Sequence, residues 1–175
     1  MSTFKLNHGS CADQTVDAVV NAANGYLAAG GGICGVIFSK CGHTELTQAC
    51  SAIPVPVKDG DAVITPAFNM KNAKYIIHAV GPDFNKTPKA FLELFNAYYN
   101  SLLILKNNNL HSISFPLISS GIFGGNLQNP ATESAKQCGR AYKKFFQNYP
   151  KYNINVMLCA FTPAEYQASK TELGI

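Results

Sequence analysis

Short apolar runs alternate with longer mixed segments along the whole chain. The first run, 17–21, is nearly all apolar and β-branched, which is typical of a strand that is buried on both faces of a sheet. Runs of the same kind predict four more strands, at 62–65, 75–80, 112–117 and 154–160. The segments between them predict five helices, at 36–40, 45–51, 88–106, 130–148 and 163–170. This alternation predicts an α/β fold in which helices cover both faces of one sheet, a three-layer α/β/α sandwich.

Three of the predicted helices open with proline, at Pro88, Pro130 and Pro163. Proline suits the first turn of a helix because the N–H that it lacks would be unpaired there. Asn129 and Thr162 precede two of these prolines and are natural N-caps. The polar and proline pattern therefore fixes the expected starts of these helices.

The chain has 175 residues, of which 47% are hydrophobic and 14% are charged. This is enough for one full core, and no repeat or linker divides the chain, so residues 1–175 are expected to form a single domain. The net charge of +4 suits a phosphate-bearing partner. The fourteen basic residues are spread without clustering, however, and direct nucleic-acid binding is not expected.

No run of eighteen apolar residues occurs, and residues 1–5 lack the apolar core of a signal peptide. A cytoplasmic protein without membrane contact is expected. The six cysteines are then expected to be free thiols. Cys34, Cys41, His43 and Cys50 are an alternative zinc set, but their spacing matches no common ligand pattern, so neither a metal nor a cofactor is predicted.

Two glycine-rich loops follow predicted strands. Gly30, Gly31 and Gly32 precede a predicted helix, and three glycines let backbone N–H groups approach an anion at a helix N-terminus. A bare triglycine is also common in flexible turns. The second loop, 116–126, holds Phe123 between glycines, where the ring either packs on a sugar or anchors the loop. Together the loops predict a cleft at the carboxyl edge of the sheet.

Four segments in order carry a family resemblance: 16–24, the triglycine loop, 77–82 and 119–124. They resemble the successive hallmark segments of macro domains, and the resemblance covers nearly the whole chain. The chain is most similar to the branch of MacroD-type hydrolases and the macro domains of coronavirus-like polyproteins. The resemblance implies a central mixed, mostly parallel sheet that binds ADP-ribose or an ADP-ribosylated protein.

The resemblance also implies a set of binding residues. Asn24 matches an asparagine that hydrogen-bonds the distal ribose, whereas Asn21 ties down the turn. Phe161 matches an aromatic near adenine, with a core phenylalanine as the alternative, and His78 is expected to be a packed structural histidine. The diphosphate and distal ribose are expected to be clasped by two loops, Gly30, Gly31, Gly32 and Ile33 on one side and Ser119, Ser120, Gly121, Ile122 and Phe123 on the other.

Two departures from the family pattern affect these expectations. Relatives commonly have Gly-Asp-Ile where this chain has Gly9, Ser10 and Cys11, and the aspartate accepts a hydrogen bond from adenine. Ser10 and Cys11 are therefore expected at the adenine end with a weaker hydrogen bond, unless nearby Asp13 compensates. At Cys34, MacroD-type hydrolases have an aspartate that acts on water.

The resemblance implies a hydrolase that removes mono-ADP-ribose from Asp or Glu side chains, or that deacetylates O-acetyl-ADP-ribose. Asn24, Gly32 and Phe123 are the expected catalytic residues, which act by orienting the ligand and a water. The alternative is a non-catalytic reader of ADP-ribose, which the replacement at Cys34 favours. A monomer is expected in either case.

Overall fold

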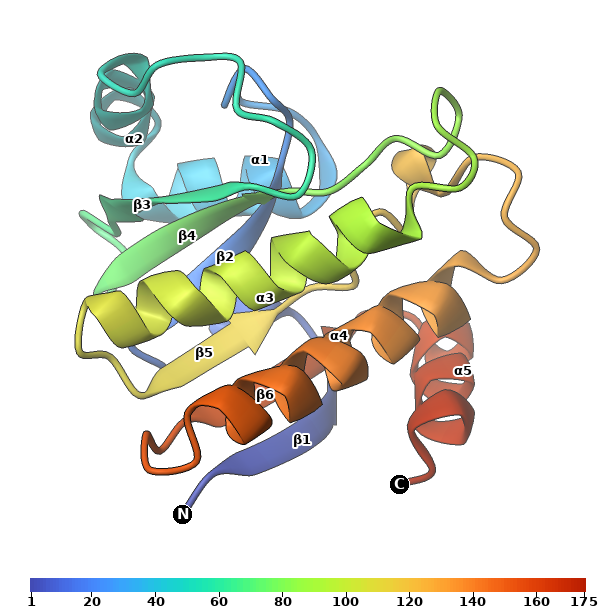
Figure 1. Cartoon of the computed structure of the whole chain (residues 1–175). Coiled ribbons are helices and arrows are strands. Elements are labelled where there is room, and N and C mark those ends of the chain that lie inside the picture. Colours follow the sequence, from blue (N-terminus) through green and yellow to red (C-terminus); the bar gives the residue numbers. More distant parts are fainter.

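A six-stranded sheet runs through the centre of the computed structural model, which describes all 175 residues (Figure 1). The strands are β1 (Thr3–His8), β2 (Ala18–Ala23), β3 (Ala62–Pro66), β4 (Tyr75–Val80), β5 (Ser112–Phe115) and β6 (Asn155–Ala160). The helices are α1 (Gly32–Cys41), α2 (His43–Ser51), α3 (Phe91–Asn107), α4 (Pro130–Asn148) and α5 (Pro163–Leu173). Two short 3₁₀ turns lie at Cys11–Asp13 and Ile122–Gly124.

The strand order is β1-β6-β5-β2-β4-β3, and only β3 is antiparallel to its neighbour. The mixed, mostly parallel sheet is therefore confirmed. From β2 the chain continues to β3 and β4 on one side, whereas β5 leads to β6 on the other side. A crevice is expected where the strand order reverses in this way, at the carboxyl ends of the strands.

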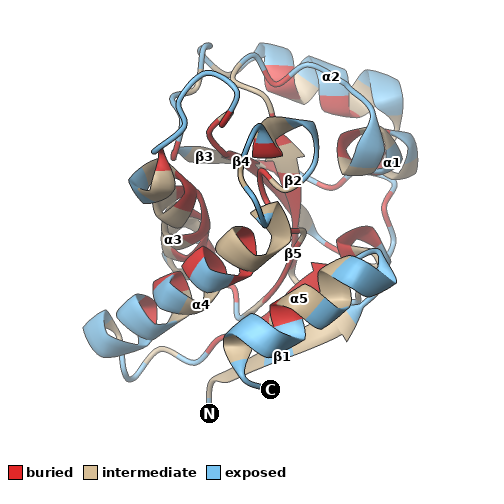
Figure 2. Ribbon diagram, turned by 90° about the vertical axis from the view of Figure 1, so that its right-hand side faces the viewer, coloured by how far each residue is buried: buried red, intermediate tan, exposed pale blue.

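Two separate cores lie on the two faces of the sheet. Helices α1 and α2 cover one face, and α3 and α4 cover the other, with α5 packed beside α4 (Figure 1). Successive residues of β2 explain its unbroken apolar run, because Val19 packs in the α1 core and Val20 in the α3 core. Figure 2 shows the buried residues concentrated on the sheet and on the inner sides of the helices. The three-layer sandwich is confirmed.

Helix starts are partly as predicted. Pro130 and Pro163 open α4 and α5, and Thr162 forms a full capping box with Glu165. Asn129 occupies the N-cap of α4, but its side chain makes no capping hydrogen bond. Pro88 was wrong as a helix start, since α3 begins only at Phe91. Residues 83–87 instead form a turn in which the Asp83 carbonyl accepts from the N–H groups of Lys86 and Thr87.

Two further elements differ most from the sequence prediction, and the ends of the others shift by at most three residues. Strand β1 was missed, although it pairs with β6 over six residues. Helix α1 begins at Gly32, four residues earlier than predicted.

All six cysteines are buried free thiols, as predicted. No group of three or more His, Cys, Asp or Glu side chains is arranged to hold a metal ion. None of the helices is long and apolar enough to span a lipid bilayer.

Candidate functional site

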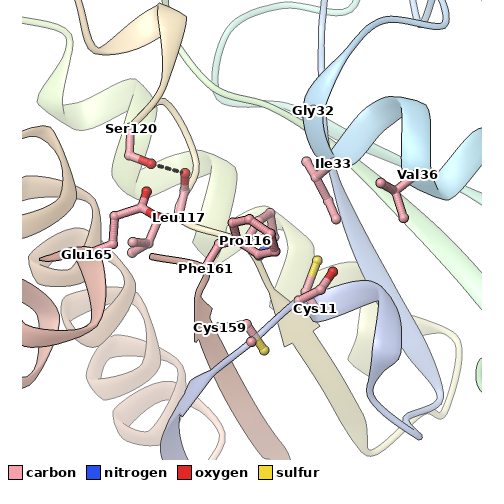
Figure 3. Close-up of a pocket in the computed structure, with 12 residues that line it drawn as sticks. Cys11, Gly32, Ile33, Val36, Pro116, Leu117, Ser120, Cys159, Phe161 and Glu165 are labelled. Carbon is pink, nitrogen blue, oxygen red and sulfur yellow. Dashed lines mark hydrogen bonds between the residues drawn. The ribbon is translucent and has the colours of Figure 1, made fainter. Parts of the chain in front are cut away.

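A cleft of about 350 Å³ lies at the carboxyl ends of the parallel strands, within the size range of small-molecule sites. Figure 3 shows Gly32, Ile33 and Val36 of α1 on one side of it and Leu117, Ser120 and Glu165 on the other. Its twelve lining residues lie at the end of β6, in the segments that follow β1, β5 and β6, or in the first two turns of α1 and α5: Gly9, Ser10, Cys11, Gly32, Ile33, Val36, Pro116, Leu117, Ser120, Cys159, Phe161 and Glu165.

The start of α1 forms one wall and has no side-chain cap. The first N–H groups of a helix have no partner within the helix, so those at Gly32, Ile33 and Cys34 are available to an anion. Gly32 has a φ of +58° and open space around its Cα. Gly35 is required for a different reason, because a Cβ there would lie 2.8 Å from the Gly30 carbonyl oxygen. The triglycine loop is thus packed closely against the helix that it precedes.

The loop 117–125 forms the facing wall and is held by hydrogen bonds to residues 82–85. The Ser119 hydroxyl donates to the Pro82 carbonyl at 2.7 Å, and the Phe84 N–H donates to the Phe123 carbonyl at 2.8 Å. Ser120 lines the cleft and donates its hydroxyl to the Leu117 carbonyl. Ile122 is 91% exposed at the tip of the loop.

Six of the predicted ligand-binding residues line the cleft: Ser10, Cys11, Gly32, Ile33, Ser120 and Phe161. Phe161 is 73% exposed, so the alternative of a core phenylalanine was wrong. The other predicted residues lie in the two loops without lining the cleft: Asn24, Gly30, Gly31, Ser119, Gly121, Ile122 and Phe123. Their contacts with a ligand stay predictions.

Asn24 uses its carboxamide within its own loop. Its Oδ1 accepts from the N–H groups of Tyr26 and Ala28, each at 3.1 Å, and its Nδ2 donates to the Ala28 carbonyl at 3.0 Å. This side chain therefore shapes the segment that leads to the triglycine.

Ser10, Cys11 and Cys159 also line the cleft. Ser10 Oγ accepts from the Ala12 N–H at 3.2 Å and caps the 3₁₀ turn. Burial raises the pKa of Cys11 well above its ordinary value and raises the pKa of Cys159 to about 11. Both thiols are therefore protonated at neutral pH and are poor nucleophiles. Asp13 does not compensate for the missing aspartate, because it pairs with Lys40 at 3.0 Å and does not line the cleft.

Glu165 was missed by the sequence analysis, although it is the one charged side chain that lines the cleft. The signal was present in the sequence. Thr162 was predicted as an N-cap, and a Glu three residues later completes a capping box. The box places Glu165 in the first turn of α5, four residues after the predicted site residue Phe161.

A buried polar cluster lies beneath α1, next to the cleft. Asn21 Nδ2 lies 3.1 Å from His78 Nδ1, and His78 Nε2 lies 2.9 Å from Thr65 Oγ1. Asn21 Nδ2 also contacts the sulfur of Cys34, which in turn contacts the Ala28 carbonyl, each at 3.7 Å. Asn21 Oδ1 is buried without a partner. The predicted structural role of His78 is confirmed, and Cys34 ties α1 to the Asn24 loop.

His78 should make the free energy of unfolding depend on pH. Burial lowers its pKa from the ordinary 6.5 to about 4. The unfolded chain therefore binds a proton between these values that the folded chain does not, so the free energy of unfolding falls as the pH falls. We expect a loss on the order of 3 kcal/mol between pH 6.5 and pH 4 from this residue.

Urea unfolding at several pH values gives the free energy of unfolding of the wild type and of His78→Gln. The loss is measured as the difference between the two proteins in how steeply this free energy falls with falling pH. NMR titration of the His78 imidazole in the wild type checks it without a variant. A His78 ring that becomes protonated near pH 6.5 would contradict the prediction.

Comparison with known proteins identifies the family. The model of the family described as "Macro domain" matches residues 20–138, which include both glycine loops. The chain belongs to the macro domain family. The family resemblance inferred from the sequence motifs is therefore confirmed.

Relatives of this macro domain include an enzyme and proteins with bound nucleotides. The O-acetyl-ADP-ribose deacetylase of Salmonella typhimurium is 37% identical over 152 residues, which cover 85% of this chain and 82% of that protein. The macrodomain of Oceanobacillus iheyensis with ADP is 32% identical with a TM-score of 0.89, and the match covers 99% of this chain and 90% of that one. The Trypanosoma brucei macrodomain in complex with ADP-ribose is 26% identical with a TM-score of 0.86, covering 98% and 69%.

Proposed function

We propose that this macro domain binds ADP-ribose in the cleft between α1 and the loop 117–125. The observation that carries the proposal is the uncapped start of α1, where Gly32 lines the cleft with open space around its Cα. Backbone N–H groups at a helix start suit a diphosphate without any lysine or arginine. The nucleotides named for the Oceanobacillus and Trypanosoma macrodomains support the same ligand class.

The ligand is proposed to lie across the cleft in one orientation. Its diphosphate contacts the N–H groups of Gly32 and Ile33 on one side and the Ser120 loop on the other. Its adenosine lies toward Ser10 and Phe161, where the exposed ring offers a stacking surface. The distal ribose then extends toward Asn24 and Phe123, which lie outside the cleft described above.

We further propose that the bound ligand is hydrolysed. Water attacks the anomeric carbon of an ADP-ribosyl ester of Asp or Glu, the bond from that carbon to the ester oxygen breaks, and the side chain leaves as a carboxylic acid. In O-acetyl-ADP-ribose, water attacks the acetyl carbonyl instead and acetic acid leaves. The Salmonella relative named as a deacetylase supports this second reaction.

Catalysis is proposed to rest on orientation and not on a strong base. His78 is fully buried with a lowered pKa, and the thiols of Cys11 and Cys159 have raised pKa values, so none of the three is suited to activate water. Asn24 shapes the loop around the distal ribose, Gly32 supplies a backbone N–H, and Phe123 confines the water against the ligand phosphate. Holding reactants in a reactive geometry alone contributes large rate factors.

A reader that binds ADP-ribose without cleaving it is the second candidate. Cys34 favours it, because this side chain is buried in contacts with Asn21 and Ala28 and does not line the cleft. It therefore supplies no group that acts on water.

Loss of label from a protein mono-ADP-ribosylated on Asp or Glu, followed over time, separates the two candidates. Release of acetate from O-acetyl-ADP-ribose and calorimetric binding of ADP-ribose are measured in parallel. Turnover of either substrate together with binding supports the hydrolase, and binding without turnover leaves the reader. Absence of both contradicts the proposed function.

A further inference from the structure

The cleft contains a single charged side chain, the carboxylate of Glu165. Its first carboxylate oxygen, Oε1, accepts from the Thr162 N–H at 2.9 Å, and its own N–H donates to Thr162 Oγ1 at 3.1 Å. These two bonds fix the side chain at the start of α5. Neither of the two ion pairs of the chain involves Glu165, and Oε2 accepts no hydrogen bond from the protein. One carboxylate oxygen is thus held in place and the other is free.

Figure 3 shows the Glu165 carboxylate on the same side of the cleft as Leu117 and Ser120, opposite α1. Side chains around it are mostly apolar, including Leu117 and Pro116, and Phe161 adds an exposed aromatic ring. Such walls suit a flat aromatic group, on which a single polar contact sets the orientation.

The two sides of the cleft carry charges of opposite sign. The uncapped start of α1 carries partial positive charge and attracts an anion. The Glu165 carboxylate repels a phosphate, and the start of α5 is already capped by Thr162. A nucleotide diphosphate is therefore held with its phosphates at α1 and its base at α5.

A carboxylate only accepts hydrogen bonds. At the α5 end it therefore favours a ring that carries an exocyclic amino group, whose N–H donates, and it repels a ring with a carbonyl oxygen at that position. Ser10 lies in the same cleft, and its hydroxyl proton is not used by any protein acceptor. The Glu165 carboxylate therefore supplies the acceptor that the amino group of adenine needs.

We propose that Glu165 reads the base of the bound nucleotide and selects an amino-bearing purine over its carbonyl counterpart. This inference rests on the proposed binding of ADP-ribose in the cleft. It assigns base recognition to the first turn of α5.

The test compares ADP-ribose with inosine diphosphate ribose, in which a carbonyl oxygen replaces the amino group, by calorimetric titration of the full chain. We expect the wild type to bind ADP-ribose at least about ten-fold more tightly, as a hydrogen bond to a charged group allows. In Glu165→Gln the two affinities should agree within about three-fold, because an amide both donates and accepts. Glutamine also preserves the capping box, so folding is retained.

Glu172→Gln is the matched control, since it removes the same charge from the exposed far end of α5. It should keep the wild-type preference. An unchanged preference in Glu165→Gln, with both ligands still bound, would overturn the inference while the proposed function stands. A wild type that binds neither ligand would contradict the proposed function, and the inference would fail with it.

Discussion

Gly32→Val is expected to weaken ADP-ribose binding by at least about 100-fold, or about 3 kcal/mol. Gly32 has a φ of +58°, a conformation that a β-branched residue strongly disfavours, and its added side chain would point into open space beside the cleft. The first N–H groups of α1 would then lose their alignment toward the diphosphate. Each such hydrogen bond to a charged group contributes about 1.5–3 kcal/mol. Calorimetric titration measures the loss.

Gly174→Val is the control for this change. Gly174 caps α5 with a φ of +67°, and a Cβ there also meets nothing within 4 Å, but Gly174 does not line the cleft. Both variants should lose about 2 kcal/mol of stability from backbone strain. Only Gly32→Val should lose affinity. Equal binding by the two variants would show that the start of α1 does not hold the diphosphate.

Asn24→Ala is expected to lower the turnover of an ADP-ribosylated substrate by about 100-fold at saturating substrate. A loss of this size is typical when reacting groups are displaced from their reactive geometry. Binding should weaken much less, because the start of α1 is left intact. The substitution removes the three hydrogen bonds that shape residues 24–28. Single-turnover measurements of label loss separate the rate of the chemical step from binding.

Asn24→Asp sharpens this test, because a carboxylate still accepts from the N–H groups of Tyr26 and Ala28 but cannot donate to the Ala28 carbonyl. It should retain more activity than alanine. Asn148→Ala, which removes one exposed hydrogen bond to Tyr99, is the control and should be fully active. Full activity of Asn24→Ala would contradict the role of this loop in catalysis.

The sandwich and the cleft were predictable because they depend on strong local signals. The apolar run that forms β2 can bury both of its faces only between two helical layers. The two glycine loops follow strands that end at one edge of the sheet. The triglycine was correctly predicted to lie beside a helix N-terminus. The exact start of this helix was not predicted, because the sequence does not show that Gly32 adopts a positive φ and begins α1.

The errors come from tertiary contacts. Strand β1 lies at the edge of the sheet and is only partly buried, so its alternation of Phe4 and Leu6 with polar residues is a weak signal. Pro88 follows a turn that is closed by the Asp83 carbonyl, and this turn delays the start of α3. Glu165 was missed for another reason: a capping residue is normally assigned a purely structural role, and only the fold places it in the cleft.

NMR titration of the isotopically labelled wild type with ADP-ribose is the most direct test of ligand binding in this cleft. We predict saturable shifts of the backbone amides of Gly32, Ile33, Ser120 and Phe161, with none at Lys136 and Arg140 beside the separate groove between α4 and α5. An absence of saturable shifts, or shifts confined to residues outside the cleft and its two loops, would contradict the proposed site.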